Sequence, residues 1–300
     1  MESDFLIYNA VQEDDNKKLY SILKSNMNLS RRMIIGLKKS GGIYINGSHA
    51  MTNAIVKKGD TVSVDIKRQE TQDIAPQDIP IDVVYEDRDL LIVNKQPGIV
   101  VHPTKGHPEG TLSNGIIYHW RSNGDDSIVR LVNRLDRDTS GLMIVAKNKF
   151  SHQAMAKQLD ANKVVKIYIA VVHGAFKKEE GTIDLPIDRP THESIKREVL
   201  KSGQNAITHF KVIENYKAGS LLKIRLETGK THQIRVHMSY IGHPLFGDTL
   251  YGVQDDSEYI KRQALHAVML KFDHPRTGKD MCIKADLPDD IKSLIKKLGC

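Results

Sequence analysis

The first 66 residues carry apolar positions at helical spacing. Leu19, Ile22 and Leu23 would lie on one side of a helix. Ser30 is suited to cap a second helix, and Gly41-Gly42 would end it, because glycine adopts the left-handed conformation that closes a helix. Two short helices are therefore predicted in this segment.

Alternating apolar residues follow the two helices. Residues 43–45 and 61–66 alternate between apolar and polar side chains, as half-buried strands do. Asn46-Gly47 is a strong signal for a hairpin turn. The pattern predicts a small unit in which two helices pack against a short sheet.

The remainder of the chain has more expected strands than helices, and the two do not alternate regularly. This pattern favours an α+β fold with a mostly antiparallel sheet over a doubly wound parallel sheet. Strands are expected at 83–85, 90–93, 142–145, 164–172, 206–213 and 221–226, and helices at 111–120, 151–159, 232–241 and 290–298.

A polar segment with two prolines, residues 67–80, separates these two regions and is typical of a linker. We expect a small α+β domain at 1–68, of which residues 1–15 form an acidic N-terminal extension. A linker would follow at 69–80, and a large domain would occupy 81–300.

The charge is unevenly spread. The net charge is +7, yet residues 16–68 hold 11 Lys and Arg against only Asp60 and Asp65, which gives this segment +9. Ordinary surface lysines would explain a scattered excess better than one concentrated in a small unit. The concentration indicates a polyanion binder.

The composition sets further limits. No apolar run approaches the ~20 residues that span a bilayer, and the start lacks a secretory pattern. Two cysteines, Cys282 and Cys300, are too few for a disulfide framework and suit a reducing cytoplasm. We expect a cytoplasmic monomer without membrane contact.

The segment NRLDRDTSGLMIVAK, residues 133–147, is the strongest candidate for chemistry. Asp136 lies before a run of turn-forming residues, and the apolar run that follows indicates a buried strand. A carboxylate fixed beside a cation, here Arg134, is a plausible catalytic group because the cation keeps the acid ionised. An isolated RLD triplet would more often be a surface ion pair.

This segment resembles the HRLD-x-x-TSG box of the RluA/RluD-type pseudouridine synthases. Five collinear boxes over about two hundred residues make the resemblance specific. Two positions depart from it, since Asn133 stands where His is more usual and Lys230 where Arg is more usual. The other boxes are DLLIVNKQPGIVVHP at 89–103, KIYIAVVHG at 166–174, TGKTHQIRVH at 228–237 with GHPLFGDTLYG at 242–252, and LHA at 265–267 before HPRTG.

The N-terminal unit is similar to the S4 RNA-binding domain, with an LSRR box and a GGIYING turn. Clustered basic residues and a helix N-terminus suit phosphate contacts that position a protein on RNA without reading sequence. A purely structural module is the alternative. The basic residues expected to contact RNA are Arg31, Arg32, Lys38 and Lys39.

The resemblance implies isomerisation of uridine to pseudouridine within an RNA chain, and it favours ribosomal over transfer RNA. This chemistry requires no cofactor and no metal. Asp136 would act on the nucleoside, either as a nucleophile or by assisting elimination. By resemblance, Arg134 fills the gap left by the flipped uridine, and Tyr168 stacks on the uracil. Arg235 and Lys230 would pair with the carboxylate, and Leu265 would pack against the base.

Two rival functions remain at this point. A retaining hydrolase could use Asp136 with Asp138, but such enzymes need a second acid about 5 Å away and a set of sugar-binding aromatics. A non-catalytic RNA-binding or ribosome-assembly protein could keep the same fold. His232 and His237 lie five positions apart and would not share a helix face, so they indicate core or RNA-contact residues rather than metal ligands.

Overall fold

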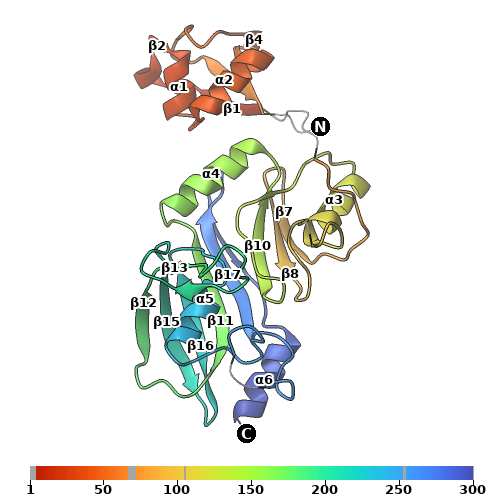
Figure 1. Ribbon diagram of the computed structural model, residues 1–300. Coiled ribbons are helices and arrows are strands. Elements are labelled where there is room, and N and C mark those ends of the chain that lie inside the picture. The colour runs from red at the N-terminus through yellow and green to blue at the C-terminus, as the bar shows by residue number, and fades with distance from the viewer. Residues whose placement is uncertain (1–4, 67–71, 105, 253–254, 300) are drawn as a thin grey trace.

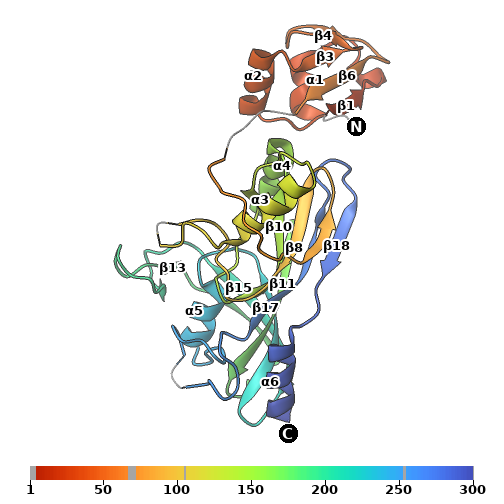
Figure 2. The ribbon, with the colours of Figure 1, turned by 90° about the vertical axis from the view of Figure 1, so that its right-hand side faces the viewer.

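The computed structural model describes residues 5–66, 72–104, 106–252 and 255–299, which build a small and a large part (Figure 1). Each part has its own hydrophobic core. The small part and the C-terminal helix α6 (Asp289–Gly299) lie at opposite ends of the molecule in Figure 1 and in the turned view of Figure 2. Among the described residues, none of the helices has the length and apolar character that a membrane span requires.

The small part is a four-stranded antiparallel sheet in the order β1-β6-β3-β4, covered by two helices. A second pair of strands, β2 and β5, joins the loops beside it. Its elements are β1 (Phe5–Asn9), a 3-10 helix at Gln12–Asp14, β2 (Lys17–Lys18), α1 (Leu19–Ser25), α2 (Arg31–Ser40), β3 (Ile43–Ile45), β4 (Ser48–His49), β5 (Ile55–Val56) and β6 (Thr61–Asp65).

The expected capping and turn residues of the small part do what the sequence predicts. Ser30 caps α2, because its side chain accepts a hydrogen bond from the backbone N–H of Met33. Gly41 ends the helix in the left-handed conformation at φ 69°. Asn46 and Gly47 both have positive φ and join β3 to β4, as a two-residue hairpin requires.

The expected acidic extension at 1–15 is wrong for the residues that the structure describes. Phe5–Asn9 is strand β1 and pairs with β6 along its whole length. Asp14 is buried and accepts hydrogen bonds from the hydroxyl of Tyr8 and from Nζ of Lys17. The density of acids suggested solvent exposure, but hydrogen bonds from residues on both sides of Asp14 allow its carboxylate to be buried.

The large part is built on one ten-stranded sheet. The order is β12-β15-β16-β11-β17-β10-β8-β7, with β18 beside β17 and β9 beside β10. Among the strand pairs that the structure describes, only β10–β17 is parallel, so the prediction of an α+β fold with a mostly antiparallel sheet is confirmed. The strands are β7 (Val83–Glu86), β8 (Leu90–Lys95), β9 (Arg130–Leu131), β10 (Ser140–Ala146), β11 (Val165–His173), β12 (Glu180–Asp184), β15 (Ile207–Asn215), β16 (Gly219–Leu226), β17 (Leu265–Asp273) and β18 (Asp280–Lys284). A separate hairpin pairs β13 (Ile187–Asp188) with β14 (Glu198–Val199).

Helices cover both faces of this sheet. Side chains of α3 (Leu112–Ser122) and α5 (Gln233–Tyr240) pack on one face, and those of α4 (Lys149–Asp160) and α6 pack on the other. Burial on both faces explains why the central strands β8 and β10 read as continuous apolar runs instead of alternating. Tyr168 points to the face that α5 covers.

Contacts between described residues join the two parts. Phe150, in the first turn of α4, packs into the core of the small part. Nη1 of Arg276 donates to the carbonyl of Phe5 at 3.1 Å, and Nζ of Lys157 donates to the carbonyl of Asn28 at 3.0 Å. Ile74, which was expected in the linker, packs into the core of the large part. The division into domains at 68 and 81 stays a prediction.

Candidate active site

The loop that carries Asp136 is fixed to the sheet at both ends. The side-chain oxygen of Asn133 accepts from the backbone N–H of Ile144 at 2.8 Å, so Asn133 ties the start of the loop to β10. At the other end, Gly141 has φ 114°, and a Cβ there would lie 2.4 Å from the carbonyl oxygen of Ala267 in the parallel strand β17. The TSG signature therefore needs glycine because two backbones meet at this point.

Two buried cations hold the middle of the same loop. Lys95 donates to the carbonyls of Gln96, Ile99 and Arg137 at 2.8, 3.1 and 2.8 Å. Nη1 of Arg262 donates to the carbonyl of Asp138 at 3.0 Å. These bonds satisfy the carbonyls of a loop that lies against the core, and they leave the Asp136 carboxylate a defined position.

Arg235 lies between two carboxylates, Asp136 and Asp248. Its Nη1 donates to Oδ2 of Asp136 at 3.0 Å. Its Nε and Nη2 donate to the two oxygens of Asp248 at 2.7 and 2.8 Å. Asp248 also accepts from the backbone N–H groups of Leu250 and Tyr251, so the guanidinium is anchored on its far side.

The charges at this site reinforce one another. Burial would lower the pKa of Arg235, but the bonds and charges of Asp248 and Asp136 raise it overall. Burial would raise the pKa of Asp248, but Arg235 and two backbone N–H groups lower it overall. Arg235 therefore stays a cation and offers Asp136 a fixed positive charge.

His232 is the third ionisable group near Asp136. It precedes α5 in the left-handed conformation at φ 59°, and its Nε2 lies 3.9 Å from Oδ2 of Asp136. Its Nδ1 lies 2.9 Å from the hydroxyl of Tyr251. Burial lowers the pKa of His232, so the ring is neutral at pH 7. His237, one turn further on, instead lies 2.9 Å from Thr208 Oγ1 and 2.9 Å from the carbonyl of Leu185.

Tyr168 and Leu265 form the apolar side of the site. Tyr168 is 6% exposed and Leu265 is 4% exposed. Burial and the charge of Asp136 raise the pKa of Tyr168, so its phenol keeps the proton at neutral pH. A neutral aromatic ring beside a carboxylate can stack on a planar base.

All six residues predicted from the sequence for the site line one pocket of about 70 Å³. A groove of about 750 Å³ shares Arg134, Asp136, Tyr168 and Lys230 with this pocket. The pocket is lined by Arg134, Leu135, Asp136, Thr139, Tyr168, Leu226, Gly229, Lys230, His232, Gln233, Ile234, Arg235 and Leu265.

Arg235, which the resemblance implied as the partner of Asp136, donates to this carboxylate in the structure. Arg134, which the local pattern placed beside the carboxylate, is exposed and forms no hydrogen bond or ion pair with any described residue. Nζ of Lys230 donates to the side chain of Gln204 at 2.9 Å instead of contacting Asp136. An ion pair with a residue 99 positions away depends on the fold, so the neighbouring Arg134 was the more visible candidate.

Asp248 and Gln233 are the residues that sequence reasoning missed. Gln233 organises the TGKTHQIR segment, because it accepts from the backbone N–H of Lys230 and donates to the carbonyl of Ile207. Asp248 lay within the matched GHPLFGDTLYG box. The available signal was an aspartate inside a matched box to which no role had been assigned. The pairing of Asp248 with Arg235 could not be read from the spacing of the two residues.

Asp138 does not complete a two-carboxylate site. Its oxygens accept from Nε and Nη2 of the neighbouring Arg137, with the shortest bond at 3.0 Å. It lies outside the residues that line the pocket around Asp136. This placement counts against the retaining hydrolase, because the second acid would have to face the same substrate.

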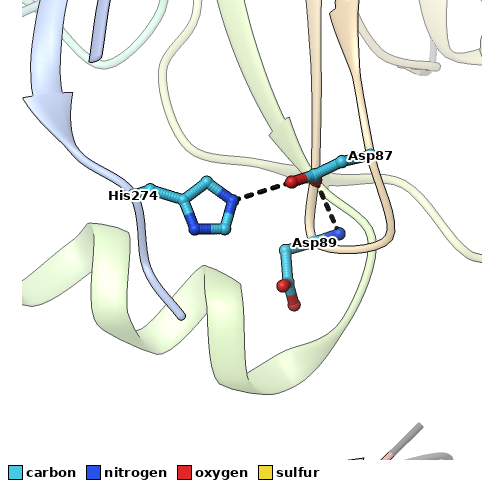
Figure 3. Close-up of side chains that lie close together, drawn as sticks. All are labelled: Asp87, Asp89 and His274. Atoms are coloured by element: carbon cyan, nitrogen blue, oxygen red, sulfur yellow. Dashed lines mark hydrogen bonds and ion pairs between the residues drawn. The ribbon is translucent and has the colours of Figure 1, made fainter. Parts of the chain in front are cut away.

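A second carboxylate cluster lies where the small part meets the large one. Figure 3 shows His274 pointing at Asp87, with Asp89 beside them. Such a trio could hold a metal ion, but its acceptors are already used. Asp89 accepts two bonds from Arg276, at 2.5 and 2.8 Å, and His274 Nδ1 accepts from backbone N–H groups. Arg276 thus supplies the positive charge that a metal would bring, and we assign the cluster a structural role.

The four basic residues expected to contact RNA are all exposed on α2. Arg31 and Arg32 lie in its first turn, and Lys38 and Lys39 lie in its last turn. Their side chains form no hydrogen bond or ion pair with the described part of the chain. They are available to an external anion.

Comparison with known proteins gives the family. Residues 89–240 match the model of the RNA pseudouridylate synthases, and this range contains Asp136, Tyr168 and Arg235. The chain is 42% identical over 293 residues to an uncharacterized RNA pseudouridine synthase, YlyB of Bacillus subtilis, covering 96% of each chain. It is 39% identical over 282 residues to ribosomal large subunit pseudouridine synthase D of Pseudomonas aeruginosa, covering 90% of this chain and 88% of the relative.

Solved structures show the same fold. A human RNA pseudouridylate synthase domain containing 4 superposes with a TM-score of 0.60 at 22% identity, covering 72% of this chain and 92% of that one. A human RNA pseudouridylate synthase domain containing 1 gives 0.58 at 24% identity, covering 77% and 97%. The chain belongs to the RNA pseudouridylate synthase family.

Proposed function

We propose that this protein isomerises specific uridines of large-subunit ribosomal RNA to pseudouridine, and that Asp136 acts on the nucleoside. The observation that carries the proposal is the state of the Asp136 carboxylate. One of its oxygens is held by Arg235, and the carboxylate faces a pocket with Tyr168 and Leu265. A carboxylate oriented on one side and open on the other suits attack on a sugar carbon or proton removal from the sugar.

The reaction balances without a co-reactant. The N1–C1′ bond of the nucleoside breaks, the uracil turns, and C5 bonds to C1′, while one proton leaves C5 and one is gained at N1. Asp136 can serve as nucleophile or assist elimination, and both routes are compatible with its position. Tyr168 and Leu265 would sandwich the uracil during its rotation, and Arg134 and Lys230 lie at the pocket where RNA enters.

The RNA target is inferred from the relatives and from the charge. The Pseudomonas aeruginosa relative is described as acting in the large ribosomal subunit. The small part carries the basic helix α2, which supports an S4-like role in holding structured RNA. We propose that it acts on ribosomal RNA in the cytoplasm and works there as a monomer.

Carbodiimide labelling of RNA tests the proposed reaction, because it detects pseudouridine although the isomerisation leaves the mass unchanged. Fragments of large-subunit ribosomal RNA are incubated with the wild-type protein and with Asp136→Asn. A labelled site that appears only with the wild type supports the proposal. RNA binding without labelling by either protein favours the alternative, a non-catalytic ribosome-assembly protein with the same fold.

The role of the small part is tested by removing its charge without removing the fold. Arg31, Arg32, Lys38 and Lys39 are all changed to Gln, and the salt dependence of RNA binding is measured. Each lost phosphate contact lowers the slope of log K against log salt by ~0.7–0.9. A matched control changes four exposed lysines of the large part, Lys177, Lys178, Lys211 and Lys217, to Gln. An equal change in both variants would count against an S4-like function.

A further inference from the structure

Lys166 is a buried cation that the proposed chemistry does not use. It lies on β11 two residues before Tyr168, so both side chains point to the same face of the strand. It is 8% exposed and lines the 750 Å³ groove together with Tyr168 and Asp136. A Cβ built on Gly229 would lie 3.6 Å from Nζ of Lys166, and Gly229 lines both the pocket and the groove. The ammonium group therefore lies where the pocket opens into the groove.

No described residue satisfies this ammonium group. Nζ of Lys166 forms no hydrogen bond or ion pair within residues 5–66, 72–104, 106–252 and 255–299. Nζ of Lys166 keeps some accessible surface. Because Lys166 lines the groove, an anion in the groove can reach this atom. Glu227, the acid nearest in sequence to Gly229 on the groove wall, is instead engaged by His209 at 2.8 Å.

Lys95 shows what a structural buried lysine looks like in this protein. Lys95 is 1% exposed, and its Nζ donates to three backbone carbonyls that it holds in place. Lys166 is also buried, but its Nζ donates no hydrogen bond to any described residue. Burial lowers the pKa of Lys166, so the folded protein keeps this charge at a cost to its stability. A desolvated cation without a partner, beside a proposed reaction site, indicates an anion that arrives with the substrate.

We propose that Lys166 binds a phosphodiester of the RNA backbone next to the uridine held at Asp136. The inference rests on the proposed function, because RNA supplies the anion. A phosphate in the groove would give Lys166 a partner and would fix the sugar relative to Asp136. Exposed cations such as Arg134 can contact phosphate as well, but among the Lys and Arg residues that line the groove only Lys166 is buried.

The test is a double-mutant cycle between one residue and one phosphate. The RNA is a large-subunit ribosomal stem–loop on which the wild type forms pseudouridine. It is prepared with a neutral methylphosphonate at one linkage at a time on either side of the target. We expect one linkage whose neutralisation weakens wild-type binding about 10-fold, and Lys166→Met to weaken binding to unmodified RNA about as much. Combined, the two changes should weaken binding no more than either alone.

Three controls make the result specific. Lys166→Arg should keep the coupling to the same linkage. Lys223→Met removes an exposed lysine from the neighbouring strand β16 and should leave binding unchanged. Lys166→Met should also unfold at the same or a higher temperature than the wild type, since it removes an unpaired buried charge.

Two results would overturn the inference. One is additivity at every linkage, which would mean that Lys166 contacts no phosphate. The other is a lower unfolding temperature of Lys166→Met with unchanged RNA affinity, which would mean a structural role. If no fragment is modified by the wild type, the proposed function fails, and the cycle is still run on the fragment that binds most tightly because it needs only binding.

Discussion

The clusters around Asp89 and around Asp136 are built from the same residue types, but only the Asp136 cluster faces a pocket. In both, a guanidinium lies between an aspartate and a second group, with a histidine beside them. Asp89 has no exposed side-chain surface and accepts from Arg276, Asn148 and Ser151. Asp136 keeps 23% of its side chain exposed and accepts one hydrogen bond from the described part of the chain, which Arg235 donates.

The difference separates a structural cluster from a reactive one. Asp89 and Arg276 satisfy each other and join the small part to the large part through the carbonyl of Phe5. Arg235 donates two N–H groups to Asp248 and one to Asp136, so Asp136 keeps unused acceptor capacity. The two clusters share their residue types, so composition does not show which carboxylate is reactive. The Asp136 carboxylate accepts fewer hydrogen bonds than that of Asp89 and can therefore still bind a substrate.

The largest effect is expected for Asp136→Asn. Pseudouridine formation should fall by about 10³-fold or more, because the amide can neither attack the sugar nor remove a proton. Stability should hardly change, since Arg235 keeps its two bonds to Asp248. Single-turnover rates and thermal unfolding measure both. Residual turnover above about one per cent of wild type would count against a direct chemical role.

Asp248→Asn tests whether the carboxylate that anchors Arg235 contributes to the reaction at Asp136. Arg235 would lose its main anion and be free to shift toward Asp136, so kcat should fall by about 100-fold with KM little changed. The variant should also be destabilised by ~3 kcal/mol, because one partner of a buried pair is removed. Steady-state kinetics and urea unfolding test this expectation. Full activity in the folded variant would show that Arg235 needs no second carboxylate.

Much of this arrangement was predictable from the sequence. The helices and strands follow local signals, such as Ser30 before α2 and the apolar run of β10, and the expected elements are confirmed. The loop signals also placed Asp136 correctly against a buried strand. These features depend on residues close together in the chain.

The remainder depends on contacts between distant residues. The resemblance implied that Arg235 pairs with Asp136, but no local signal reports this pair, because it depends on α5 packing on the sheet. That Phe5–Asn9 is a strand depends on β6, which lies more than fifty residues later. The absence of any partner for Lys166 among the described residues is a property of the whole fold, and no local pattern reports it.

Arg134 lies at the Asp136 cluster, is exposed, and has no hydrogen-bond or ion-pair partner in the described chain. A guanidinium plane can replace base stacking when the uridine leaves the helix. Arg134→Ala should lower single-turnover rates about 10-fold on paired RNA and less where the target is already unpaired, since less unstacking energy is needed. Arg134→Lys should rescue poorly, because an ammonium lacks the planar surface. Good rescue by Lys on both substrates would instead indicate a charge contact.

The smallest effect on activity is expected at the closed cluster. Asp89→Asn should leave the folded enzyme within a few-fold of wild-type activity but should lower its stability by ~3 kcal/mol at pH 7, because Arg276 is left buried without a full partner. Burial would raise the pKa of Asp89, but the bonds from Arg276 and Asn148 lower it overall from its ordinary value of 3.8.

The pH dependence of this stability follows from the direction of the shift. A lowered pKa in the folded state means that the unfolded chain binds the proton more readily, so the contribution of Asp89 is complete above about pH 4 and declines below it. The stability difference between wild type and Asp89→Asn should therefore shrink as the pH falls from 5 toward 3, whereas Asp136→Asn should differ little from wild type at pH 7. Urea unfolding at several pH values measures this difference. A constant difference across that range would mean that the pKa of Asp89 is the same in the folded and the unfolded chain, and thus that Arg276 does not stabilise its charge.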